Sequence, residues 1–122
     1  MDRTFLLLGS VAAFLAVTLG AFGAHGLRAR LSPEMMAVFQ TGVQYHMYHA
    51  LALILVSAIL GRMGGWLIQT AGWAFVAGIV LFSGSLYALA LTGMTTLGAV
   101  TPIGGLAFLV GWVLLIAVAI VS

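Results

Sequence analysis

The chain has 122 residues, of which 64% are hydrophobic and 5% are charged, whereas soluble domains carry about 25% charged residues. A water-soluble domain of this length cannot hide so much apolar surface, so we expect the chain to be surrounded by lipid. The few charges form no basic patch, which argues against nucleic-acid binding, and the absence of Cys excludes disulfides, thiolate metal ligands and cysteine nucleophiles.

Four apolar segments are long enough to cross a bilayer, which takes about 20 helical residues. The first, residues 4–25, has a longer apolar run than a cleaved signal peptide, so we expect it to be retained. The others are residues 33–61, 66–91 and 102–121. The sequence therefore predicts an all-α membrane protein, a single domain over residues 1–122, with four transmembrane helices arranged as two antiparallel helical hairpins in a compact bundle.

Two prolines mark predicted helix starts. Ser32-Pro33 and Thr101-Pro102 each place a hydroxyl side chain just before a proline, the arrangement of an N-cap followed by the first helical residue. We therefore expect the second helix to begin at Pro33 and the fourth at Pro102. The shared start is also a faint internal repeat between the two hairpins.

Residues 39–50, "FQTGVQYHMYHA", form the most polar stretch of the second span. At 100° per residue its polar side chains fall within about half of the helix circumference, which predicts a polar stripe that faces the bundle. The stripe contains Gln40, Thr41, Gln44, Tyr45, Tyr48 and His49. His46 points about 60° away from His49, towards the apolar side.

The predicted topology brings further polar residues to the same leaflet. His25 ends the first span on the side where the second begins, and the third span returns to that side. The expected site therefore comprises His25, Gln44, Tyr45, Tyr48, His49, Ser83, Ser85 and Tyr87. It could hold a small ligand, a lipid headgroup or a partner subunit. Structural hydrogen bonding is the alternative, because buried polar groups need partners, and His25 could simply cap its helix.

Other functions have less support in the sequence. We expect no enzyme, since no carboxylate lies inside a span and no Ser has an identifiable base. His46 and His49 are spaced as two metal ligands could be, but spacing fixes no third ligand, so we predict no metal and no cofactor; a His-ligated metal or haem protein ranks third. The second-ranked function is an oligomeric transporter for a small solute or ion, because polar residues inside a membrane are functional candidates.

Four motifs in order resemble one family: "GAFGAHGL", "FQTGVQYHMYHALALI", "FSGSLYALALTG" and "TPIGGLAFLVGW". The chain is similar to the small membrane proteins defined by domain of unknown function 423, which include the transmembrane-protein-256 relatives. The resemblance implies a four-helix, multi-pass protein of the bacterial cytoplasmic (inner) membrane with no established activity. From the residues themselves we expect the lipid bilayer as a partner and, as open alternatives, further copies of the chain or a larger membrane complex.

The basic residues predict the orientation poorly. Arg3 and Arg62 fall on one side of the four spans, and Arg28 and Arg30 fall on the other. Because Lys and Arg favour cytoplasmic loops, this balance is compatible with dual insertion. We nevertheless expect a single orientation with the 26–32 loop in the cytoplasm, since both of its arginines flank the first hairpin.

Overall fold

The computed structural model describes residues 3–122, so Met1 and Asp2 lie outside the described part of the chain. Within residues 3–122, four helical spans are long and apolar enough to cross a membrane. The first span comprises α1 (Arg3–Thr18), the π-helical η1 (Leu19–Gly23) and α2 (Ala24–Leu27), and the second is α3 (Pro33–Met63). The third span comprises α4 (Trp66–Gly78), the π-helical η2 (Ile79–Ser83) and α5 (Gly84–Thr92). The fourth is α6 (Thr101–Val121), which follows the 3-10 helix η3 (Thr95–Ala99). The predicted all-α architecture of two antiparallel hairpins is confirmed.

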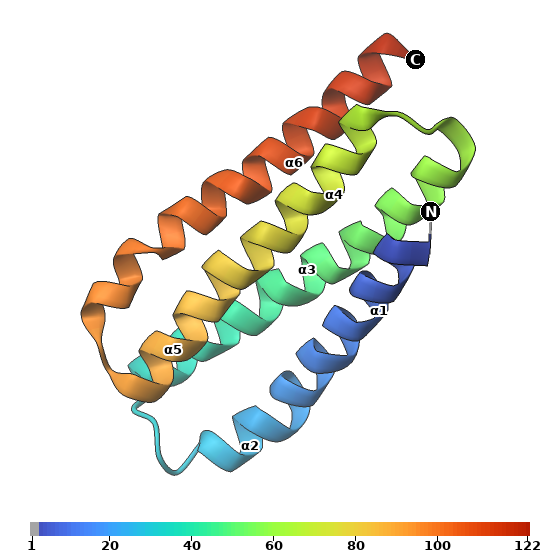
Figure 1. Cartoon of the computed structure of the whole chain (residues 1–122). Helices are drawn as coiled ribbons and strands as arrows, with labels where there is room; N and C mark the ends of the chain where they lie inside the picture. The colour runs from blue at the N-terminus through green and yellow to red at the C-terminus, as the bar shows by residue number, and fades with distance from the viewer. Residues whose placement is uncertain (1–2) are drawn as a thin grey trace.

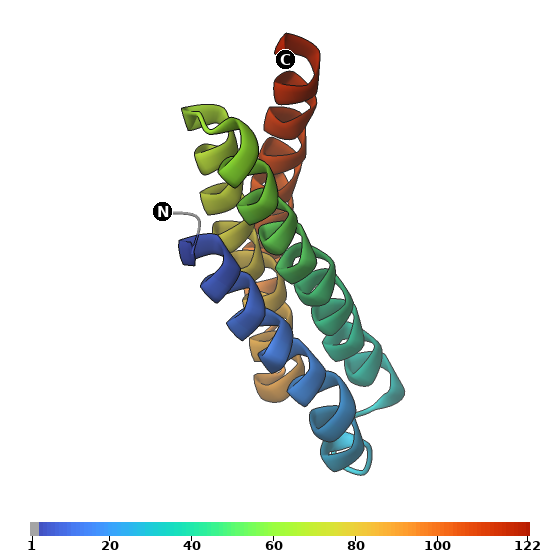
Figure 2. The same ribbon diagram turned by 90° about the vertical axis from the view of Figure 1, so that its right-hand side faces the viewer.

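The central pair of the four spans is α3 and α4–α5 (Figure 1). Within each hairpin, α1 packs on α3 and α4 packs on α6, and α3 joins the hairpins by packing against α4, η2 and α5. Figures 1 and 2 show both termini and the α3–α4 turn towards one end of the molecule and the other two connections at the opposite end. As a result, α3 is the helix with the most neighbours and the one best placed to organise the polar residues.

The helix starts follow the prolines, but the two hydroxyl groups act differently. Ser32 Oγ accepts a hydrogen bond from the backbone N–H of Met35 at 3.1 Å, and α3 then runs unbroken from Pro33 to Met63, as predicted. The cap predicted at Thr101 is wrong, since α6 already includes this residue and its side chain makes no cap. Its Oγ1 instead lies 2.6 Å from Ser85 Oγ on α5, which joins the two helices.

Close helix packing depends on several glycines, two of which lie beside the polar residues of the third span. A Cβ on Gly104 of α6 would collide with the backbone of Phe82, so no side chain fits there. A Cβ on Gly42 of α3 would lie 2.8 Å from Cε1 of Tyr87. In lipid, where helices gain little from burying apolar surface against each other, such close approach is a main source of packing energy.

The second helix of each hairpin repeats the same pattern. Ser32-Pro33 corresponds to Thr101-Pro102, Phe39 to Phe108 and Gly42 to Gly111, with equal spacings in α3 and α6. The corresponding phenylalanines are buried in both helices, and so are the corresponding glycines. The faint repeat in the sequence is therefore also a repeat of burial, so residues in the first part of α3 have counterparts on α6.

Candidate functional site

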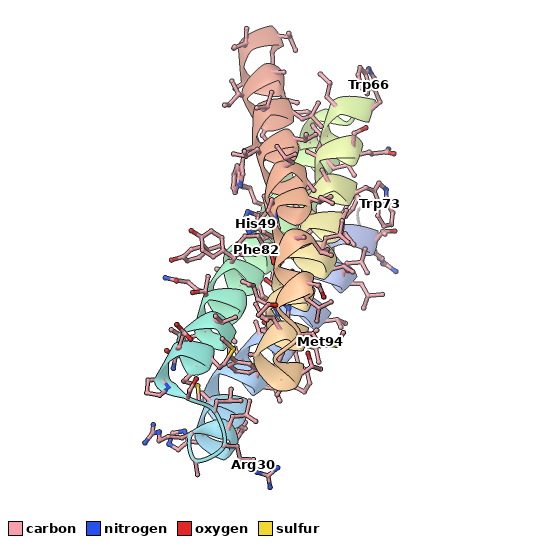
Figure 3. All side chains as sticks on the ribbon, turned by 90° about the vertical axis from the view of Figure 1, so that its left-hand side faces the viewer. Arg30, His49, Trp66, Trp73, Phe82 and Met94 are labelled. Atoms are coloured by element: carbon pink, nitrogen blue, oxygen red, sulfur yellow. The ribbon has the colours of Figure 1, made fainter. Side chains whose placement is uncertain are left out.

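The polar residues extend from the end of the molecule to the middle of its spans. His49 lies 16 residues after Pro33 and 14 before Met63, so it is about 24 Å and 21 Å from the two ends of α3 at 1.5 Å per residue. Figure 3 shows His49 and Phe82 midway between Arg30 at one end and Trp66 at the other. At this depth a polar group meets hydrocarbon unless protein covers it.

His49 is buried and fully hydrogen-bonded. The indole N–H of Trp112 donates to His49 Nε2 at 3.0 Å, and His49 Nδ1 lies 2.8 Å from the carbonyl oxygen of Tyr45. Indole nitrogen only donates and a carbonyl only accepts, so the ring must carry its proton on Nδ1 and is neutral. The ring also stacks on Phe108, with centroids 3.5 Å apart and planes inclined by 8°.

His46 is also buried: it points to the apolar side of α3, as expected, but this side faces the bundle, which corrects the expectation that the polar stripe alone would do so. Its Nδ1 lies 2.8 Å from the hydroxyl oxygen of Tyr87 on α5, and the Ala12 backbone on α1 interacts with the same ring. Although they are three residues apart, the two histidines turn to different neighbours: His46 to α1 and α5, and His49 to α6. In this arrangement they do not converge on a common ligand.

One cavity of about 240 Å³ lies beside His46, between α1 and the third span. Its other lining residues are all apolar: Leu8, Val11, Ala12, Leu15, Leu53, Val76, Ile79 and Val80. Such a lining suits a lipid tail and offers no second polar group to a solute.

The serines of the third span hold the helices together. Ser83, which has no exposed surface, donates from Oγ to the carbonyl oxygen of Gly42 at 2.7 Å. Ser85 Oγ bridges the Phe82 carbonyl oxygen, at 2.9 Å, and the Thr101 hydroxyl. Ser83 is the last residue of the π-helical η2, in which the Gly84 N–H bonds to the Ile79 carbonyl five residues earlier. This wider turn, with one residue more than an α-helical turn, therefore lies where the third span contacts α3.

The remaining predicted site residues face outwards, and the prediction of a polar stripe turned to the bundle is wrong for them. Gln44 and Tyr48 are exposed on α3, where Gln44 Nε2 donates to the Tyr48 hydroxyl at 2.7 Å. Tyr45 is 38% exposed, although its ring packs 4.9 Å from that of Phe82. His25 is exposed at the end of the first span and bonds only to the Ala21 carbonyl of its own helix, at 3.0 Å.

Gly42 explains this rotation of α3. Because it has no side chain, Tyr87 can approach the backbone there, which turns the Phe39, Gly42 and His46 side of the helix towards α5. The polar stripe consequently meets the neighbouring helices only along one edge, through His49 and the ring contact of Tyr45 with Phe82. Its other members, Gln40, Thr41, Gln44, Tyr45 and Tyr48, form an outward surface that we call the α3 polar face.

Trp112 and Thr101 are the site residues that the sequence interpretation missed. A signal was present for Trp112, because its indole N–H lies in the middle of the most apolar span and needs an acceptor there. Nothing in the local sequence distinguishes Thr101 as a partner of Ser85 from Thr101 as a helix cap.

The internal polar groups satisfy one another. In residues 3–122 no buried side-chain nitrogen or oxygen lacks a hydrogen-bond partner, and no three His, Cys, Asp or Glu side chains gather as a metal site would require. The internal contacts are therefore suited to fixing α1, α3, α5 and α6 relative to one another. By contrast, the α3 polar face carries polar groups that still have unused hydrogen-bond donors and acceptors, such as the amide of Gln44.

Comparison with known proteins identifies relatives along nearly the whole chain. A family model described as protein of unknown function (DUF423) matches residues 19–105. The UPF0382 membrane protein YwdK of Bacillus subtilis is 50% identical over 119 residues, which cover 97% of each chain. UPF0382 membrane proteins of Staphylococcus haemolyticus and Staphylococcus aureus are 48% and 46% identical over 117 residues, 93% of each chain. No solved structure matches.

Proposed function

Because this chain belongs to the DUF423 family of membrane proteins, we propose that it is a non-enzymatic subunit that binds a partner's transmembrane helix through the α3 polar face. The relatives are bacterial, and helical spans are typical of the cytoplasmic membrane, whereas outer-membrane proteins are mostly barrels. We therefore assign this subunit to the bacterial cytoplasmic (inner) membrane.

The exposure of Gln44 and Tyr48 near the middle of a membrane span carries the proposal. Tyr48 is 50% exposed, and its bond to Gln44 uses only one of the two amide hydrogens of that side chain. Hydrocarbon can satisfy neither the second hydrogen nor the amide oxygen. A neighbouring helix can, and hydrogen bonds between membrane helices are worth about 0.6–2 kcal/mol each.

The outward faces of the flanking helices differ in chemistry. Exposed side chains on the first span include Leu7, Phe14 and Phe22, and those on α6 include Leu109 and Val113, all of which suit lipid tails. Among the helices of residues 3–122, only α3 has an outward face that combines amides, a hydroxyl and phenols. The contrast supports a protein neighbour for α3 and lipid for α1 and α6.

A small-solute or ion transporter is the second candidate, favoured by the position of His46, His49 and Ser83 near mid-span, where carriers hold their substrates. The hydrogen bonds count against it, because these three groups already bond to other parts of the chain. Solute flux into vesicles that contain only the purified chain would favour this candidate.

The test is the mass of the complex extracted from native membranes in a mild detergent. We expect the 12.7-kDa chain to migrate in a larger assembly and the double variant Gln44→Leu, Tyr48→Phe to release it. The control is Val113→Leu, at the corresponding exposed position of α6. A wild-type chain that migrates alone, or a double variant that stays in the assembly, would contradict the proposal.

A further inference from the structure

We infer that the helix that docks on the α3 polar face is α3 of a second copy, in the same orientation, around a two-fold axis along the membrane normal. This inference rests on the proposed function and names its partner. It adds two claims, that the partner is the chain itself and that the two α3 helices run parallel.

The exposed residues of α3 form a continuous seam with the spacing of a coiled coil. Steps of four and three residues alternate along it, which is the 3.5-residue repeat that keeps one stripe against a partner helix. Every member of the seam is exposed: Ala37, Thr41, Gln44, Tyr48, Leu51, Leu55, Ala58 and Arg62. The seam therefore runs nearly the whole length of α3. The other faces of this helix are covered by α1 and by the second hairpin.

The polar groups of the seam are complementary to themselves. In a parallel two-fold pair each seam position meets its own copy, so Gln44 meets Gln44, and an amide is both donor and acceptor. The Tyr48 hydroxyl already accepts from Gln44 of its own chain, and its hydrogen remains available for the partner's amide oxygen. A pair of identical helices can thus satisfy the groups that lipid leaves unpaired.

An antiparallel pair matches these groups poorly. With the two seams centred on each other, Gln44 would lie opposite Leu55 and Thr41 opposite Ala58, so both polar groups would face apolar residues. Arg62, the only charge in the seam, lies in the last turn of α3, outside the apolar part of the span in either arrangement. The hydrogen bonds, rather than the charge, therefore select the parallel pair.

The hairpin repeat provides an internal comparison. The α6 counterparts of Thr41, Gln44 and Tyr48 are Val110, Val113 and Ala117. Val110 and Val113 are as exposed as their counterparts on α3, yet they are apolar. Over residues 37–44 and 106–113 the two helices have nearly the same burial pattern but opposite outward chemistry, and of the two only the seam of α3 is suited to a protein neighbour.

Disulfide trapping tests the inference directly, because the chain has no cysteine of its own. Thr41→Cys and Leu55→Cys are introduced singly, and the purified variants are oxidised in liposomes of bacterial phospholipid at a high lipid-to-protein ratio. We expect covalent dimers from each single variant. Val113→Cys, on the corresponding face of α6, is the control and is expected to stay at least fivefold less cross-linked.

The other outcomes separate the inference from the function on which it rests. Cross-linking only when Gln44→Cys and Leu55→Cys chains are mixed would mean an antiparallel pair and would overturn the parallel arrangement. Cross-linking no stronger than that of Val113→Cys would overturn pairing between copies. If the native assembly still depends on Gln44 and Tyr48 in that case, the proposed function stands with a different partner; if it does not, both fail.

Discussion

Each buried histidine holds a different helix against α3, His49 through Trp112 on α6 and His46 through Tyr87 on α5. Both bonds cross between spans where no water can replace a missing partner. Removing one partner should therefore destabilise the fold through the unpaired group that stays behind.

Trp112→Phe is expected to lower the free energy of unfolding by about 1–3 kcal/mol, because it leaves the acceptor at His49 Nε2 without its donor. The measurement is reversible unfolding in mixed micelles, followed by circular dichroism. Trp66→Phe is the control, since Trp66 is 71% exposed and should change stability little. Equal effects of the two variants would show that the bond to His49 contributes nothing specific.

A double-mutant cycle measures the second bond. We expect His46→Phe and Tyr87→Phe to be coupled by about 0.6–2 kcal/mol, the range of hydrogen bonds between membrane helices. Additive effects of the two substitutions would contradict a bond between these side chains.

At the level of single residues the sequence predicted the inward position of His49 but not that of His46 or the role of Trp112. Helical periodicity identifies which residues share a face, yet it does not say which face meets a neighbour. The face of α3 that meets α5 is the one that contains Gly42, because the absence of a side chain there lets Tyr87 approach the helix. A single sequence carries no such information about the opposing helix.

Among the helices, α3 depends most on a single small residue. Gly42→Ala is expected to destabilise the protein by about 1–3 kcal/mol, because the new methyl group would lie 2.8 Å from the Tyr87 ring and displace it from His46. Unfolding in mixed micelles again provides the measurement.

Gly84→Ala is the matched control on α5. A Cβ there meets no atom within 4 Å, so the better helix propensity of Ala should leave stability unchanged or raise it by up to about 1 kcal/mol. Similar losses in both variants would mean that glycine flexibility, rather than the contact with Tyr87, is what α3 needs.

The starts of α3 and α6 were predictable to within one residue because proline acts locally at a helix start; Ser32 adds a cap to α3, whereas Thr101 adds none to α6. The π-helical η1 and η2 were not, since each interrupts an apolar run that contains no proline. Such a turn accommodates one extra residue for the benefit of packing. At η2 the benefit is the bond from Ser83 to Gly42, which is a tertiary contact and leaves no pattern in the local sequence.

For the whole molecule, orientation and assembly are linked. Both termini and the α3–α4 turn lie towards one end, so Arg3 and Arg62 oppose Arg28 and Arg30 across the four spans (Figure 1). We expect a reporter fused to the C-terminus to be active only outside the cytoplasm, because Arg28 and Arg30 hold the first connection inside. Activity on both sides would reveal dual insertion and would also weaken the case for a parallel pair.

The central claim is that protein, rather than lipid, covers the α3 polar face. The most direct measurement is photo-cross-linking in intact cells, with p-benzoylphenylalanine replacing Tyr48 in one strain and Val113 in another. We expect a discrete protein adduct from position 48, with twice the mass of the 12.7-kDa chain, and only lipid adducts from position 113. Lipid adducts alone from both positions would show that lipid covers the α3 polar face and that no protein neighbour is bound there.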